Sequence, residues 1–388
     1  MFKESPTLAA KQIINKRIAD NLPVYNGGLG ENPLPISKYL QDELKKHTHL
    51  KEYTSTSGIP ELQNILGKNL VVGNGSKELI YVLQLSYSKL YPNGCIFYIY
   101  PAWVSYMEQS KIIGTRTQGI NVNNNYKVNL DDLENKLKSI YPIPSFIIFN
   151  NPCNPTGIIY TDNEVKQIAE IFKKYNTIVL NDCIYKRLVH TKYNDCGNLL
   201  DYYDNVIDSS SLSKTFACGG YRFGWLSFPD KLDKLFKVTT SFASSIYSCP
   251  TLVLQHVAVK ALKFPDQIKK DIKFQQEMFQ VIGEYLYQKL TDLELICSFP
   301  QAAWYIWINF ENYKNKLSKL GIHSSDELTV YLANKLGIVV VSGSAFYSNE
   351  LACRYSYVDI DINMETREYD FTRIKQFILV FSEWMNNI

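Results

Sequence analysis

Short apolar runs alternate with amphipathic helical patterns between about residues 70 and 230, and this alternation most constrains the fold of the chain. Three such runs are Cys95–Tyr100, Phe146–Phe149 and Thr177–Leu180. Between the last two, Thr161 and Glu164 form a capping-box pattern that opens a helix with apolar side chains three and four residues apart. Strand, helix and strand joined by short loops are typical of a parallel sheet with crossover helices. We therefore predict an α/β fold with a mostly parallel central sheet flanked by helices.

The pattern changes beyond about residue 292 to a mixture of strands and helices. Apolar runs at Trp304–Ile308 and Ile338–Val341 predict strands, and the spacing from Ile374 to Trp384 predicts a closing amphipathic helix. A chain of 388 residues also exceeds what one hydrophobic core usually supports. We predict an N-terminal arm with part of a small domain (1–45), a large domain (46–292) and a C-terminal small α+β domain (293–388), with a ligand cleft between the domains.

Composition restricts the class of partner. The formal net charge of +3 comes from 41 basic and 38 acidic residues without a basic block, which argues against a nucleic-acid or membrane-surface partner. No uncharged stretch reaches the length of a membrane-spanning helix. Eight cysteines occur without a CxxC pair, so reduced thiols are expected. We predict a cytoplasmic protein that has no structural metal.

Polar residues follow the predicted strands at the points where ligands of parallel sheets bind. The segments are NNPCNPTG after Phe149, NDCIY after Leu180, SSSLSK after the run near Val206, and GNGSK at a helix start. Taken singly, each segment has a structural explanation: a proline-rich turn, a solvated carboxylate, a flexible polar loop and a helix cap. Together they suit one ligand that carries a phosphate, an aldehyde and a basic ring nitrogen.

Each part of such a ligand has a candidate partner. Lys214 supplies the amine that an aldehyde needs, and Asp182 supplies the carboxylate that keeps a ring nitrogen protonated. Asn154 and Tyr185 are candidates for hydrogen bonds to a phenolic oxygen of the ring. Backbone N–H groups, hydroxyls and cationic side chains for the phosphate come from Gly75, Ser76, Lys77, Ser211 and Arg222.

These motifs resemble those of the class I/II pyridoxal-phosphate aminotransferases of fold type I, and the resemblance covers nearly the whole chain. The similar motifs are the NPTG turn at Asn154, the Asp and Tyr pair Asp182-x-x-Tyr185, and the SxSK…R signature of Ser211, Lys214 and Arg222. The resemblance implies a central sheet of the seven-stranded type. It also implies a pyridoxal 5′-phosphate cofactor held as a Schiff base on Lys214.

Further similarity assigns expected roles to four residues. Trp103, in Pro-Ala-Trp, resembles the aromatic residue that stacks on the cofactor, although a core tryptophan is the structural alternative. Tyr53 resembles the tyrosine that reaches the phosphate of the neighbouring subunit's cofactor, which implies a homodimer. Gly30 resembles the glycine element that closes over the substrate. Arg354 matches the arginine that grips the substrate α-carboxylate, with an exposed surface arginine as the alternative.

The resemblance implies an enzyme that moves an amino group from an amino acid to a 2-oxo acid by a ping-pong mechanism, with Lys214, Asp182 and Tyr185 as catalytic residues. A lyase or decarboxylase of the same fold and a histidinol-phosphate-type aminotransferase remain alternatives. An aminotransferase-like domain of a transcription regulator is disfavoured because the chain has no basic helix-turn-helix pattern. Nucleotide binding is disfavoured because neither GxGxxG nor GxxxxGK[ST] is present.

The chain departs from the family pattern at two places and leaves its substrate open. Cys183 follows Asp182, and Phe346-Tyr347 replaces the more usual Phe-Gly near a small-domain strand, where Tyr347 is expected to reshape the substrate side of the cleft. Five of the seven arginines lie in no motif for binding a distal substrate carboxylate: Arg17, Arg116, Arg187, Arg367 and Arg373. An aromatic or neutral amino acid is therefore favoured over a dicarboxylate.

Overall fold

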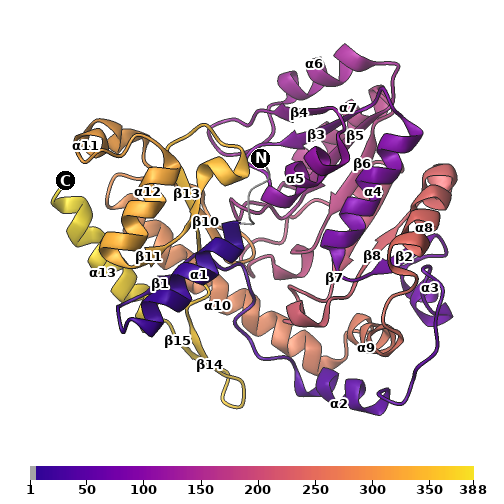
Figure 1. The fold of residues 1–388 in the computed structure, drawn as a ribbon, viewed down its shortest axis with the longest axis horizontal. Helices are drawn as coiled ribbons and strands as arrows, with labels where there is room; N and C mark the ends of the chain where they lie inside the picture. The colour runs from indigo at the N-terminus through magenta and orange to yellow at the C-terminus, as the bar shows by residue number, and fades with distance from the viewer. Residues whose placement is uncertain (1–5) are drawn as a thin grey trace.

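A seven-stranded sheet forms one half of the molecule, on the right in Figure 1. The computed structural model describes residues 6–388, and residues 1–5 of the predicted N-terminal arm lie outside the described part. The strand order is β2-β8-β7-β6-β5-β3-β4. The strands are β2 (Leu70–Gly73), β3 (Cys95–Ile99), β4 (Thr117–Ile120), β5 (Ser145–Asn150), β6 (Ile178–Asp182), β7 (Val206–Ser211) and β8 (Gly224–Ser227). Only β8 runs antiparallel to its neighbours, β2 and β7. The predicted α/β fold with a mostly parallel sheet is confirmed.

Helices cover both faces of this sheet. Alternate side chains of a strand point to opposite faces, so each strand packs against both layers of helices. In β5, Phe146 and Ile148 pack against one set of helices, and Ile147 and Phe149 pack against another. The first set is α4 (Ser76–Leu90), α5 (Val104–Ile113) and α8 (Asp233–Tyr247), and the second is α6 (Leu130–Ile140) and α7 (Asp162–Lys174). The capping box predicted at Thr161 opens α7 and is confirmed.

Three further helices pack at the β2 and β8 end of the sheet. Leu70 and Val72 of β2 and Trp225 of β8 share a buried cluster with apolar side chains of these helices. The helices are α2 (Lys38–Lys46), α3 (Pro60–Leu66) and α9 (Leu252–Leu262). All four residues of β2 are buried as a result.

A smaller antiparallel sheet lies beside the first, with strand order β12-β13-β10-β9 (Figure 1). Its strands are β9 (Ile296–Cys297), β10 (Tyr305–Asn309), β12 (Val341–Ser342) and β13 (Ala352–Ser356). Ile306, Ile308 and Tyr355 of this sheet share one core with apolar side chains of the surrounding helices. The helices are α10 (Asp266–Thr291), α12 (Ser325–Tyr331) and α13 (Thr372–Asn386), and α13 is the predicted closing helix.

Two more helices and a hairpin lie around the smaller sheet. They are α1 (Pro6–Ala19), α11 (Lys314–Lys319) and the hairpin of β14 (Asp361–Asn363) with β15 (Glu368–Asp370). None of the helices within residues 6–388 combines the length and the apolar character that crossing a bilayer requires.

The strand predicted at Ile338–Val341 is wrong as a single element. Its first half is β11 (Ile338–Val339), which pairs in parallel with β1 (Tyr25–Asn26) of the N-terminal segment. Its second half begins β12, which pairs antiparallel with β13. The segment changes partners at Val340, and an apolar run alone does not reveal a change of partner. The pairing with β1 also holds the N-terminal segment against this part of the chain.

Candidate active site

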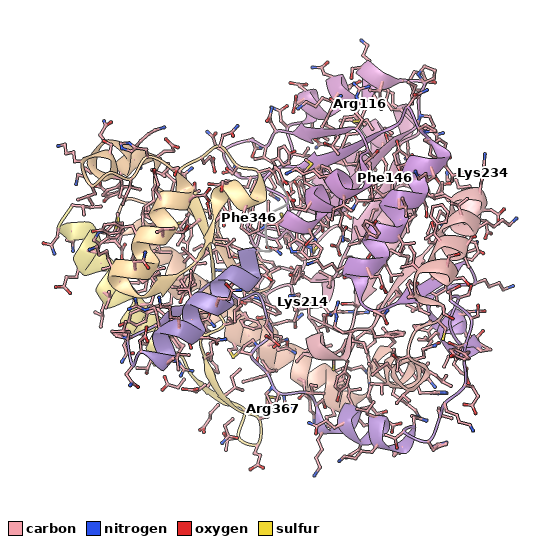
Figure 2. All side chains as sticks on the ribbon, in the orientation of Figure 1. Arg116, Phe146, Lys214, Lys234, Phe346 and Arg367 are labelled. Carbon is pink, nitrogen blue, oxygen red and sulfur yellow. The ribbon has the colours of Figure 1, made fainter. Side chains whose placement is uncertain are left out.

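A cavity of about 440 Å³ collects residues from both sheets and from the N-terminal segment. Figure 2 labels Lys214 near the centre of the molecule, between the two halves of the structure. Ten residues predicted from the sequence line this cavity: Gly30, Ser76, Lys77, Trp103, Asn154, Asp182, Tyr185, Lys214, Arg222 and Arg354. Residues separated by more than 300 positions in the chain thus meet at one site.

Three predicted residues lie outside the cavity wall. Gly75 lies directly behind it, with a φ of 92° that favours glycine, and a Cβ there would lie 2.3 Å from Nη2 of Arg222. Ser211 is buried, and its Oγ accepts a hydrogen bond of 3.1 Å from the backbone N–H of Ser213. Tyr53 is 89% exposed on the surface of the single chain.

Asp182, the last residue of β6, carries an unsatisfied buried oxygen. Its Oδ2 accepts a hydrogen bond from the Tyr106 hydroxyl, whereas its Oδ1 has no partner among the described residues. Burial raises the pKa of this carboxyl to about 6, against the lowering effect of the Tyr106 hydrogen bond. A cationic N–H group placed at Oδ1 would supply both the missing hydrogen bond and the missing charge, as a protonated pyridine nitrogen does.

The buried carboxyl predicts a pH-dependent stability for protein freed of cofactor. Because folding raises the pKa of Asp182, the folded chain binds more protons than the unfolded chain between the ordinary pKa and about 6. The free energy of unfolding contributed by this group therefore falls as the pH rises through that range. Asp182→Asn removes this titration. The free energy of unfolding of the variant, relative to that of the wild type, should therefore rise by about 1.4 kcal/mol between about pH 5 and about pH 8. Urea unfolding at the two pH values measures the gain, and a constant difference would contradict it.

Lys214 lies in the loop after β7 and is tied to the N-terminal segment. Its Nζ donates a hydrogen bond to the backbone oxygen of Gly30. Its own backbone oxygen accepts from Nδ2 of Asn32 at 2.6 Å. The Nζ lies 5.9 Å from the ring centroid of Tyr185. The segment that the sequence predicts to close over the substrate therefore contacts the proposed nucleophile directly.

Two cavity tyrosines join the larger and the smaller part of the structure. The hydroxyl oxygen of Tyr185, in the loop after β6, lies 2.8 Å from that of Tyr305, in β10 of the smaller sheet. Burial, followed by the neighbouring Tyr305, raises the pKa of Tyr185 well above its ordinary value, so its hydroxyl keeps its proton and stays a donor. This donor property suits a hydrogen bond to a phenolate oxygen of a bound ring.

Arg354 of β13 is a buried cation whose contacts are all uncharged. Only 4% of its surface is exposed, and burial lowers the pKa of its guanidinium. Its Nη1 donates to Oδ1 of Asn154 at 3.2 Å, and its Nη2 donates to the backbone oxygen of Gly28 at 2.9 Å. No carboxylate pairs with it within residues 6–388, and its buried Nε has no hydrogen-bond partner there. An anion at this position would compensate the buried charge, and a carboxylate matches the planar fork of donors.

The part of the cavity at α4 has the properties of a phosphate site. The N-terminus of α4, with Gly75 as its cap and Ser76 as its first residue, faces the cavity without a side-chain cap. Arg222 holds its guanidinium beside this terminus through hydrogen bonds to the backbone oxygens of Gly219 (2.8 Å) and Asn74 (3.1 Å). A helix N-terminus beside a guanidinium attracts a dianion. With the Asp182 oxygen and the Lys214 amine, these residues fit pyridoxal 5′-phosphate.

Among the cavity residues that the sequence analysis did not predict, Tyr106 and Tyr305 bond to predicted site residues, Asp182 and Tyr185. Tyr106 lies on α5 three residues after Trp103, the N-cap residue of this helix, so the two side chains are neighbours, and their ring centroids are 5.2 Å apart. This spacing was the available signal for Tyr106. Tyr305 reaches the site only through the packing of the smaller sheet against the larger one, and no local pattern marks it.

The family model for aminotransferase class I and II matches residues 26–363. Aspartate aminotransferase from Sulfolobus acidocaldarius is 29% identical over 346 residues, which cover 84% of this chain and 82% of the relative. A probable aspartate aminotransferase from Methanocaldococcus jannaschii is 27% identical over 372 residues, covering 90% of this chain and 92% of the relative. The match therefore extends across both sheets and all of the cavity residues.

Solved structures share the same fold. Aspartate aminotransferase from Thermus thermophilus with maleate superposes with a TM-score of 0.85 at 18% identity, covering 98% of this chain and 97% of that one. Aromatic aminotransferase from Pyrococcus horikoshii gives 0.81 at 20% identity, covering 96% and 99%. With the family match over most of the chain, these similarities identify the protein as a member of the class I and II aminotransferases, a pyridoxal 5′-phosphate-dependent transaminase of fold type I.

Proposed function

We propose that the protein transfers the amino group of a dicarboxylic amino acid to a 2-oxo acid by a ping-pong mechanism, with Arg354 as the site of the α-carboxylate. The observation that carries this proposal is the buried guanidinium of Arg354, which has no carboxylate partner among the described residues. An amino acid and a 2-oxo acid share an α-carboxylate, so one arginine serves both half reactions. The names of the aspartate aminotransferase relatives support the dicarboxylic class.

The residues around the cofactor have separate proposed roles. When bound, pyridoxal phosphate supplies a carbonyl carbon that accepts the amino group and a cationic ring that withdraws electrons from the substrate Cα. Lys214 binds the cofactor covalently, and its freed amine moves a proton from the substrate Cα. Asp182 keeps the proton on the ring nitrogen, while Tyr185 and Asn154 face the phenolic oxygen. Trp103 covers the ring.

The other site residues bind the phosphate and enclose the substrate. The N-terminus of α4, with Ser76, and the guanidinium of Arg222 hold the phosphate, with Gly75 allowing their close approach and Ser211 shaping the adjacent turn. Gly30 and its neighbours close over the substrate and exclude water, which strengthens the charge interactions inside the site.

Lys77 is the proposed partner of the substrate's second carboxylate. Its amine lies 5.6 Å from the ring centroid of Trp103 and lines the cavity. Burial, followed by the charge of Arg222, lowers its pKa. No carboxylate pairs with this amine in the part of the chain that the structure describes. The preference for an aromatic or neutral donor rested on arginines alone, whereas a lysine also pairs with a carboxylate.

Lys77→Met tests this role against the phosphate role predicted from the sequence. Removing a charged hydrogen-bond partner should lower kcat/KM for aspartate about 10- to 150-fold. The kcat/KM for a neutral amino acid should stay near its wild-type value. Steady-state kinetics with both donors and a cofactor titration give the answer. If Lys77 binds the cofactor phosphate instead, cofactor affinity falls and both donors lose activity equally.

The quaternary state and the location of the protein also remain proposals. Tyr53 is 89% exposed in the single chain, which suits a residue that completes the phosphate site of a second copy in a homodimer. Sedimentation analysis of the holoenzyme tests this arrangement, and a monomer would contradict it. The division into segments 1–45, 46–292 and 293–388 and the cytoplasmic location stay predictions. Identifying the product as a 2-oxo acid, rather than CO₂ or ammonia, separates the transaminase from the lyase and decarboxylase alternatives.

A further inference from the structure

Tyr347, the residue at the family's usual glycine position, adopts a left-handed backbone conformation. It ends the 3₁₀ turn Gly343–Phe346 with a φ of 61° and a ψ of 27°. This conformation is unfavourable for a residue with a Cβ. A large side chain persists in such a conformation where its surroundings determine it. The contacts of the Tyr347 side chain are therefore the place to look for its role.

The Tyr347 phenol crosses from the loop of the smaller sheet to α5, which packs on the larger sheet. Its hydroxyl donates a hydrogen bond to Glu108 and accepts one of 2.7 Å from Nζ of Lys111. Glu108 and Lys111 also form an ion pair of 2.7 Å. The Tyr347 ring stacks on Tyr100, with centroids 5.9 Å apart and planes 18° apart. Glycine at this position would make none of these contacts.

The residue before Tyr347 connects this contact to the active site. Phe346 is 1% exposed, and its backbone oxygen accepts a hydrogen bond of 3.1 Å from the backbone N–H of Ala102. Its ring centroid lies 5.2 Å from the guanidinium carbon of Arg354. Figure 2 labels Phe346 where the C-terminal part of the chain meets the helices of the larger sheet. Ala102 directly precedes Trp103. The loop of residues 343–347 therefore contacts both the segment of the proposed stacking residue and the proposed carboxylate site.

We propose that Tyr347 is a positioning residue that clamps the loop of residues 343–347 to α5 through Glu108 and Lys111. This clamp holds Phe346 against Arg354 for carboxylate binding. The proposal rests on the proposed function only in taking Arg354 as the carboxylate site. Tyr347 does not line the cavity, so it acts on the substrate through Phe346 and Arg354 rather than by contact.

Tyr347→Phe tests the clamp in the holoenzyme, because it keeps the ring and removes both hydrogen bonds of the hydroxyl. The probe is maleate, a dicarboxylate without an amino group, whose dissociation constant is measured by calorimetry. Because the ion network is partly exposed, we expect maleate binding to weaken about three- to tenfold. Hydrogen exchange of the amides at 343–347 should become faster. The cofactor absorbance should not change, because the Lys214 loop is untouched.

Three further variants sharpen the test. Tyr347→Gly accepts the backbone conformation and removes the whole side chain, so it should weaken maleate binding at least as much as Tyr347→Phe. Tyr347→Phe should add little to Glu108→Gln, because both remove the same network. The matched control is Tyr313→Phe, which removes a hydroxyl that bonds within the smaller part of the structure, to the backbone oxygen of Leu293 at 2.8 Å. It should bind maleate as the wild type does.

The proposal is overturned if Tyr347→Phe binds maleate with wild-type affinity, or if exchange at 343–347 is unchanged. It is also overturned if the effects of Tyr347→Phe and Glu108→Gln simply add. Maleate binding requires no turnover, so a wild-type protein that binds maleate without transaminating would contradict the proposed function and not the clamp. If Arg354→Gln binds maleate as the wild type does, Arg354 is not the carboxylate site and the clamp proposal fails with it.

Discussion

Lys214→Ala should abolish transamination while leaving a folded protein. The variant loses the amine that binds the cofactor covalently and the base that moves the Cα proton. A positioned general base alone contributes up to about 10⁴-fold, so the rate should fall by at least about that factor. The visible absorbance that depends on the bond between Lys214 and the cofactor should disappear. Single-turnover kinetics and the absorbance spectrum measure both effects.

The matched control for this variant is Lys234→Ala. Lys234 is an exposed lysine of α8, far from Lys214 in Figure 2, and it lies outside the cavity wall. Its replacement should change neither the spectrum nor the rate. Added methylamine, a small amine that can enter the cavity, should restore part of the proton transfer in Lys214→Ala. It should not change the rate of Lys234→Ala. Full activity of Lys214→Ala would reject both proposed roles of Lys214.

The strand-end rule explains why so much of the site was predictable from the sequence. Asp182 ends β6, Asn154 follows β5, and Lys214 follows β7. These three strands are parallel neighbours in the sheet, so their carboxyl ends lie side by side and bring the three residues together. Once the parallel order is inferred from the alternation of strands and helices, the position of the site follows from it.

Residues contributed by packing between the two sheets were not predictable in this way. Tyr305 is the first residue of the buried strand β10, and its sequence pattern is that of a core residue. Its meeting with Tyr185 depends on how the smaller sheet is placed, which no local periodicity encodes. Tyr347 was recognised as a departure from the family pattern, but its contact with Glu108 and Lys111 joins positions 239 and 236 residues apart.

The unpaired state of buried charges was likewise visible only in the structure. Arg354 was assigned from its motif, and the sequence left an exposed arginine as the alternative. Its 4% exposure removes that alternative. Its hydrogen bonds to Asn154 and Gly28 show that two other chain segments orient the guanidinium, so its position does not depend on a single neighbour.

Arg354→Gln should lower kcat/KM for amino acid substrates by about 30- to 4,000-fold, because truncating one partner of a buried charged pair costs about 2 to 5 kcal/mol. Glutamine keeps a hydrogen-bond donor for Asn154 but has neither the charge nor the fork of two donors that a carboxylate needs. Arg354→Lys keeps the charge without the fork, so its loss should be smaller than that of Arg354→Gln.

A carboxylate-free amine separates carboxylate binding from general damage to the site. Ethylamine has no group for Arg354 to bind, so its slow reaction with the cofactor should proceed at similar rates in wild type and Arg354→Gln. Cofactor affinity should also be similar, because the Asp182, Lys214 and Arg222 contacts remain. If ethylamine and the amino acid lose reactivity equally, Arg354 supports the structure of the site rather than the substrate. A loss confined to the amino acid would place the α-carboxylate at this guanidinium, since the two amines differ in the group that Arg354 can recognise.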